Sequence, residues 1–142
     1  MGQLHFEEKG AFMPRETLTS KRGPAALGAY SQAVRAGDFI FISGQIPINP
    51  ETGEVVFAHI EEQTERILVN IRNILQDNGM DLSDVIKTTV YLELMDDLIR
   101  VNQVYARFFG ENPPARAAVE VGRLPKDVAI EIEAVAYKKK ER

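Results

Sequence analysis

The sequence has 142 residues, the length of one ordinary domain, and its 44% hydrophobic and 27% charged residues exclude a disordered or fibrous chain. The net charge of -4 opposes general binding of nucleic acid, because neutralising phosphates requires clustered Lys and Arg. The absence of cysteine excludes disulfide bonds, thiolate zinc sites, iron–sulfur clusters and cysteine nucleophiles.

The histidines and the apolar segments narrow the function classes further. His5 and His59 are far apart and lack the spacing of a metal-binding motif, so we expect no metal site. No apolar stretch approaches the roughly 20 residues that cross a bilayer, and residues 1–20 lack the apolar centre of a secretory signal. We therefore expect a cytoplasmic protein that does not bind membranes.

We expect a single domain over residues 23–142, preceded by an N-terminal extension over residues 1–22. The first 22 residues are polar without a hydrophobic period, and they include Met13 as a second possible start. From Gly23 onward the sequence shows regular patterns.

The first predicted elements are two strands, over residues 30–36 and 38–43, joined by a turn at Gly37. Residues 39–42 form an unbroken apolar run, which is typical of a strand covered on both faces. Gly44 then interrupts the strand and allows the backbone to approach another group closely.

Two helices are predicted with strands between and after them. Residues 60–78 form an amphipathic helix that ends at Gly79, and a β-branched run over 85–94 predicts a strand. A second helix covers residues 96–109 and ends at Gly110. Its inner stripe consists of Leu98, Val101, Tyr105, Phe108 and Phe109.

The chain is predicted to end in a hairpin of two strands, over residues 115–121 and 128–137. The element order predicts an α+β or α/β sandwich with both helices on one sheet face. Because two helices cover only that face, we expect a partner subunit to cover the other.

Polar residues at predicted interior positions are candidates for function, because burying them costs free energy unless they are paired or employed. Glu131 and Glu133 share one face of the last strand. The alternative to a functional role is that both side chains are exposed and solvated. Arg116 lies beside the small Ala118, which leaves room for a ligand. The alternative to a functional role is that Arg116 forms an ordinary ion pair with a neighbouring carboxylate. Asn102 is in line with the apolar stripe of the second helix, so its amide is expected to be buried. The alternative to a functional role is a hydrogen bond from this amide to a loop backbone.

These residue types suggest a site for a small organic acid. An arginine in a small pocket suits bidentate recognition of a carboxylate, and a glutamate beside a water molecule can transfer protons. Tyr30, in a turn of small residues, would present a phenol, although a packed aromatic is the alternative. The set indicates hydrolysis without a metal or a covalent intermediate.

Six segments in order make the sequence similar to the Rid/YjgF family, the reactive intermediate imine deaminases. The resemblance runs from about Gly23 to Tyr137. The segments are GAYSQAV at 28–34, ISGQIP at 42–47, QTERILVNI at 63–71, VNQVY at 101–105, PAR at 114–116 and LPKDVAIEIEAVA at 124–136.

The resemblance implies a chorismate-mutase-like α+β fold and a homotrimer, with a central barrel of sheets, helices outside and ligand clefts between subunits. It implies hydrolysis of 2-iminoacids, such as 2-iminobutanoate and 2-iminopropanoate, to 2-oxoacids and ammonia without a cofactor. The implied partners are this small-molecule substrate and further copies of the chain, with no nucleic acid.

By the same resemblance, Arg116 would hold the substrate carboxylate and Glu131 would activate the attacking water. The substrate-binding residues would be Tyr30, Ser43, Gly44 and Asn102, with Glu133 as a further candidate.

Two positions depart from the family pattern. Ala29 stands where many deaminases of the family have proline, which relaxes the loop that carries the tyrosine. Ala118 stands where many have cysteine, so thiol chemistry is excluded while the roles of Arg116 and Glu131 are unaffected. The substrate preference is therefore not determined.

Two other functions stay open beside the deaminase. One is a non-catalytic sensor of 2-oxoacids or other small carboxylates, and the other is an RNA-cleaving translation inhibitor.

Overall fold

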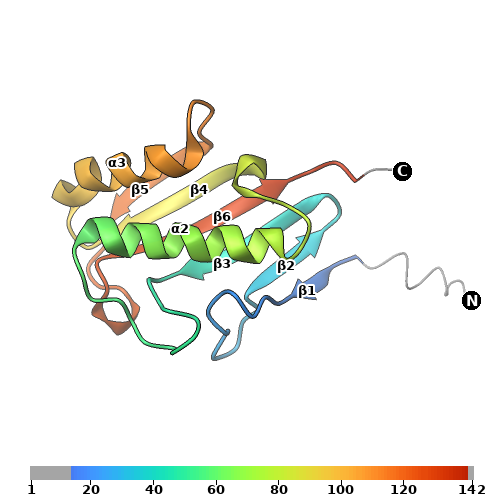
Figure 1. Ribbon diagram of the computed structural model, residues 1–142, viewed down its shortest axis with the longest axis horizontal. Helices are drawn as coiled ribbons and strands as arrows, with labels where there is room; N and C mark the ends of the chain where they lie inside the picture. The colour runs from blue at the N-terminus through green and yellow to red at the C-terminus, as the bar shows by residue number, and fades with distance from the viewer. Residues whose placement is uncertain (1–13, 141–142) are drawn as a thin grey trace, which may run out of the picture.

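The computed structural model describes residues 14–140, which form one six-stranded sheet with two helices on the same face (Figure 1). The strands are β1 (Glu16–Leu18), β2 (Ala33–Ala36), β3 (Phe39–Gln45), β4 (Val85–Leu92), β5 (Ala115–Glu120) and β6 (Ile130–Tyr137). The helices are α2 (Ile60–Gln76) and α3 (Leu98–Phe109). The predicted α+β class is confirmed.

The order of the strands across the sheet is β1-β2-β3-β6-β4-β5, and only β4 and β5 are parallel. The predicted terminal hairpin is therefore wrong, because β6 pairs with β3 and β4 rather than with β5. β6 buries Ile130 and Ile132 completely and takes a central position, whereas no residue of β5 is fully buried. The helix α3 provides the crossover that a parallel pair requires.

Part of the predicted N-terminal extension belongs to the sheet. β1 pairs with β2 in antiparallel orientation, and its Leu18 is buried in the core. The folded domain consequently begins before Gly23. Residues 1–13, with His5 and Met13, lie outside the described part of the chain.

The core lies between the two helices and the sheet. Both predicted helices are confirmed, and Gly79 and Gly110 follow their ends with φ angles of 87° and 68°, which glycine adopts without strain. The fully buried aliphatic side chains of α2 are Ile67, Leu68, Ile71, Ile74 and Leu75. Among residues 14–140, no helix combines the length and the apolar character that crossing a bilayer requires.

The opposite face of the sheet, which we call the outer face, carries exposed aromatic side chains. Along β3, Ile40 and Ile42 point to the core, whereas Phe39 and Phe41 are 38% and 46% exposed. The rings of Phe39 and Tyr137 lie 5.1 Å apart between their centroids. Within one chain, the apolar run of β3 is thus covered on one face only.

The contrast between core and surface gives a direct test of the packing. We expect Ile67→Ala to lower the free energy of unfolding by about 2–5 kcal/mol, because it leaves a cavity at a completely buried position. The matched control Ile99→Ala removes the same atoms from a side chain that is 72% exposed, and should change it by less than about 0.5 kcal/mol. Urea unfolding measures both, and equal losses would contradict the assigned core.

Candidate active site

A cavity of about 590 Å³, the Glu131 pocket, lies beside the end of β3 and the start of β6. Its walls come from the loop before β2, from the end of β3 and from β6 with the turn that precedes it. The lining includes Tyr30, Ser43, Gly44, Glu131 and Glu133. The structure therefore brings together four of the predicted site residues and the further candidate Glu133.

A bulge in β3 places the glycine backbone against the glutamate. The register between β3 and β6 shifts between Ile42 and Gln45, so that one extra residue of β3 is accommodated there. A Cβ atom on Gly44 would overlap Glu131 Oε2 and lie 2.9 Å from Glu131 Cδ. Only glycine at position 44 leaves the Glu131 carboxyl in its observed place.

The environment of Glu131 favours its protonated form. Desolvation by burial raises the pKa of the Glu131 carboxyl above its usual range, and the negative charge of Glu133 raises it further. A carboxyl group with a raised pKa exchanges protons closer to neutral pH than an ordinary one. Glu131 therefore has the property that a general acid and base needs.

Glu133 is more exposed than Glu131 and is held by a tyrosine of the neighbouring strand. Tyr91 lies opposite Glu131 in the register of β4 and β6, and its hydroxyl donates to Glu133 Oε2 at 3.3 Å. Desolvation and the charge of Glu133 both raise the pKa of Tyr91. The phenol stays protonated and acts as a donor toward the carboxylate.

Tyr30 stands in a loop that is tied to the bulge. The Ser43 hydroxyl donates to the carbonyl oxygen of Ser31 at 2.6 Å, and the Ser43 amide donates to the carbonyl oxygen of Gln32 at 3.1 Å. Gly28 allows the turn before Tyr30 with a φ angle of 140°. The Tyr30 side chain lines the pocket and remains 54% exposed.

Arg116 lies on the other face of the sheet, under α3. Its Nη1 donates to Asn102 Oδ1 at 2.8 Å, and its Cζ lies 4.9 Å from the centroid of the Tyr105 ring. Within residues 14–140 no carboxylate lies within 4.0 Å of the guanidinium, so the expected alternative of an ion pair is not observed. The guanidinium is positioned by an amide and an aromatic face, which leaves its charge available to an anion.

The ring below Arg116 is itself fixed. The hydroxyl groups of Tyr105 and Thr88 lie 2.7 Å apart and share a hydrogen bond in the core. Desolvation raises the pKa of Tyr105, although the bond to Thr88 and the charge of Arg116 oppose this effect. The neutral ring forms a rigid support for the guanidinium.

Asn102 does not have the predicted environment. The sequence pattern predicts a buried amide, whereas the residue is exposed and its oxygen accepts from Arg116. The reason is that Asn102 contacts Arg116 of β5, which is the edge strand. No further strand lies beyond β5 to cover the Asn102 side chain. Among residues 14–140, the alternative of a bond from Asn102 to a loop backbone is not observed either.

The predicted site residues thus form two groups in one chain. Glu131 and Glu133 face outward, because the alternate residues of β6 are buried under the helices. Arg116 pairs in register with the buried Thr88 and faces α3. The sheet separates Arg116 from the Glu131 pocket.

Sequence reasoning did not assign roles to Gln32, Tyr91 or Lys126, which line the Glu131 pocket or contact its carboxylates. The signal for Gln32 was its place two residues after Tyr30 in an otherwise small-residue turn. Tyr91 and Lys126 carried no signal, because their relation to the pocket depends on strand register and on the fold of a turn.

Comparisons with known proteins agree with the fold and the motifs. The family model described as Endoribonuclease L-PSP matches residues 20–138. A RutC family protein of Pyrococcus abyssi is 54% identical over 126 residues, which cover 89% of this chain and 99% of the relative. Reactive Intermediate Deaminase A of Arabidopsis thaliana, a chloroplast protein, is 43% identical over 122 residues, covering 86% of this chain and 65% of the relative.

Solved structures show the same fold. A crystal structure of RidA from an Antarctic Psychrobacter has a TM-score of 0.84 and 40% identity, and the match covers 87% of this chain and 99% of that one. A structure of TdcF from Escherichia coli with bound serine has a TM-score of 0.83 and 40% identity, with the same coverage of 87% and 99%.

The raised pKa of Glu131 predicts a pH-dependent stability. A carboxyl whose pKa is raised on folding contributes stability below its ordinary pKa and loses that contribution as the pH rises through the raised value. We therefore expect Glu131→Gln, a neutral isostere, to be more stable than the wild type at pH 7, with a gain that shrinks toward about pH 4.

Urea unfolding at both pH values measures this gain. Glu65→Gln, at an exposed position of α2, is the control for removing one negative charge. An equal gain from Glu131→Gln at both pH values would contradict the assigned environment.

Proposed function

The chain belongs to the Rid/YjgF family, whose model carries the description endoribonuclease L-PSP, and from this premise we propose that it is an imine deaminase. The proposed reaction converts 2-iminoacids, such as 2-iminobutanoate and 2-iminopropanoate, to 2-oxoacids and ammonia. The observation that carries the proposal is the half-buried Glu131, whose pKa is raised and whose carboxyl lies against Gly44 in an open pocket.

Hydrolysis of an imine needs few protein groups. A protonated imine carbon is already electrophilic, so the protein has to hold the substrate, place a water molecule and move protons. In the proposed step, the water oxygen bonds to the imine carbon while Glu131 accepts a proton from it. Glu131 then passes this proton to the nitrogen. As the carbon–nitrogen bond breaks, Glu131 accepts the proton of the new hydroxyl group, so that ammonia leaves, the carbonyl of the 2-oxoacid forms, and the ammonia takes up that proton as ammonium. Positioned acid–base catalysis of this kind contributes about 10² to 10⁴ in rate, and no cofactor takes part.

Arg116 is the proposed binding group for the substrate carboxylate. Its guanidinium has no carboxylate partner within the described residues, and Asn102 and Tyr105 hold it in place. A planar guanidinium binds a carboxylate through two parallel hydrogen bonds.

Because Arg116 and Glu131 face opposite sides of the sheet, we propose that each site forms between two copies of the chain. One copy provides Arg116 and Asn102 from the edge of its sheet. The neighbouring copy provides Tyr30, Ser43, Gly44 and Glu131. The homotrimer that the family resemblance implies would also cover Phe39 and Phe41 on the outer face, which one chain leaves exposed.

The alternatives have weaker support. The bound serine in the TdcF structure shows that a relative binds a small amino acid, which is compatible with a sensor that binds without turnover. For RNA cleavage, the net charge of -4 is unfavourable, because neutralising the phosphates of RNA requires clustered Lys and Arg.

The first test of the proposed function is an activity assay. We expect the protein to accelerate release of ammonia from enzymatically generated 2-aminoacrylate, and Arg116→Ala to lower kcat/KM by about 100-fold, because the carboxylate loses its anchor. Arg107→Ala removes an exposed arginine of α3 and serves as the control. Tight binding of 2-oxobutanoate without turnover would identify a sensor instead.

The second test addresses the sharing of the site. Arg116→Ala and Glu131→Gln should each be nearly inactive, whereas trimers assembled from equal amounts of both should regain activity. If one residue comes from each copy, about a quarter of the sites in random trimers contain both intact residues, and activity should recover to that extent. Recovery requires a shared site, so inactive mixed trimers, with assembly verified by sedimentation, would refute it.

A further inference from the structure

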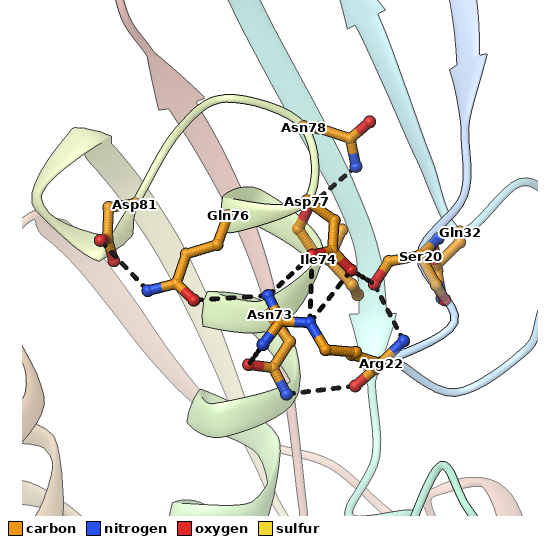
Figure 2. A network of polar contacts seen from close by, with 9 residues as sticks. All are labelled: Ser20, Arg22, Gln32, Asn73, Ile74, Gln76, Asp77, Asn78 and Asp81. Carbon is orange, nitrogen blue, oxygen red and sulfur yellow. Dashed lines mark hydrogen bonds and ion pairs between the residues drawn. The ribbon is translucent and has the colours of Figure 1, made fainter.

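A polar network joins the N-terminal segment to the end of α2 (Figure 2). Arg22 Nη2 and Nε donate to Asp77 Oδ1 at 2.7 and 3.0 Å, and the Ser20 hydroxyl donates to Asp77 Oδ2 at 2.5 Å. Asn73 completes the network, since its Oδ1 accepts from Arg22 Nη1 at 3.1 Å and its Nδ2 donates to the Arg22 carbonyl oxygen at 3.2 Å. We call these contacts the clamp.

The clamp is too exposed to contribute much to global stability. The Arg22 and Asp77 side chains are 50% and 31% exposed, and exposed ion pairs contribute about 0–1 kcal/mol. On the N-terminal side, all contacts of the clamp come from one short segment, residues 19–24, which we call the strap. Contacts concentrated in this way restrain the conformation of the strap more than they stabilise the whole fold.

The strap packs closely on α2 at its centre. A Cβ atom on Gly23 would lie 2.6 Å from Ile74 Cγ1, so the backbone of the strap sits directly on a buried side chain of the helix. A strap that moved away from α2 would lose this contact. On the helix side, the clamp residues Asn73 and Asp77 lie before and after Ile74 in the chain, and in the strap Ser20 and Arg22 precede Gly23.

The strap leads directly into the wall of the Glu131 pocket. Pro24, at its end, lines the pocket, and the following residues 25–31, the Tyr30 loop, contribute Leu27 and Tyr30. Leu27 is 82% exposed and Tyr30 is 54% exposed, so the middle of the loop has few contacts of its own. Its conformation depends on how its two ends are held.

Gln32 connects the strap to both ends of the Tyr30 loop. Its side chain is buried; Oε1 accepts from the Ser20 amide at 2.7 Å, and Nε2 donates to the carbonyl oxygens of Ser20 and Pro24 at 3.2 and 2.8 Å. The Gln32 carbonyl oxygen accepts from the Ser43 amide in the bulge of β3. Ser20 thus takes part in both the clamp and the Gln32 bonds.

We propose that Arg22 and Asp77 are positioning residues, which fix the strap to α2 and thereby hold the Tyr30 loop in the conformation that forms the Glu131 pocket. Their action is indirect, through Ser20 and Gln32. The kinetic part of this inference rests on the proposed deaminase function, whereas its structural part does not.

A broken clamp should affect binding more than chemistry. If the loop is correctly placed in only a fraction of the molecules, the apparent dissociation constant rises by the inverse of that fraction, and saturating ligand restores the correct state. We expect Arg22→Ala to raise KM, and the Kd of 2-oxobutanoate, by about 10-fold while kcat changes by less than about 2-fold. Partial unfolding would instead lower kcat and leave KM unchanged.

Hydrogen exchange measures local opening at the two ends of the Tyr30 loop and needs no assay of activity. The amides of Ser20 and Gly23, which donate hydrogen bonds in the strap, and of Ser43, which donates to the Gln32 carbonyl oxygen, should exchange about 10-fold faster in Arg22→Ala, while those of β6 remain as in the wild type. Arg100→Ala is a matched control, because Arg100 is 49% exposed and pairs with Asp97 at 2.6 Å, far from the strap in sequence. It should change neither KM nor exchange of the strap.

Two further variants test the pairing itself. Arg22→Lys keeps the charge but loses the second hydrogen bond to Asp77, so its KM should lie between those of the wild type and Arg22→Ala. The double variant Arg22→Ala/Asp77→Asn should bind no more weakly than the weaker single variant, because both changes break one unit.

The outcomes separate this inference from the proposed function. A wild type that hydrolyses no imine would refute the deaminase, while hydrogen exchange would still test the clamp. Unchanged exchange of the Ser20, Gly23 and Ser43 amides in Arg22→Ala, or faster exchange without a rise in the KM and Kd of an active enzyme, would overturn the positioning role.

Discussion

The central position of β6 is the constraint on which the site depends. Because its alternate residues are buried under the helices, the intervening Glu131 and Glu133 must face the outer side of the sheet. The bulge of β3 then brings the backbone of Gly44 against Glu131, and burial raises the pKa of that carboxyl. A strand that completes the core therefore also supplies the proposed acid–base group.

The same sheet separates the two groups of residues in the proposed site. Arg116 is on the edge strand and faces α3, where Asn102 and Tyr105 orient it without neutralising its charge. A positioned cation on one face and a half-buried acid on the other are useful together only when a second copy joins them. The exposed aromatic residues Phe39 and Phe41 of the outer face fit the same explanation, because a free chain gains little from exposing them.

The pocket also depends on a segment outside the sheet. The loop that carries Tyr30 has little packing of its own, and buried Gln32 ties it to the strap and to β3. The strap is in turn held on α2 through Asp77, and our proposal is that this exposed ion pair, with its small effect on stability, positions the wall of the pocket. Local order and global stability are separate properties in this fold.

The sequence by itself determined the two helices, the first hairpin, the inward and outward faces of β6 and the family, because periodicity, turn residues and motifs are local. Only the tertiary structure decided that β6 lies between β3 and β4, that β1 joins the sheet, and that Asn102 is exposed. It also decided that Arg116 and Glu131 lie on opposite faces. Strand order and the cover of a helix face depend on contacts between distant segments, and no local pattern in the chain contains them.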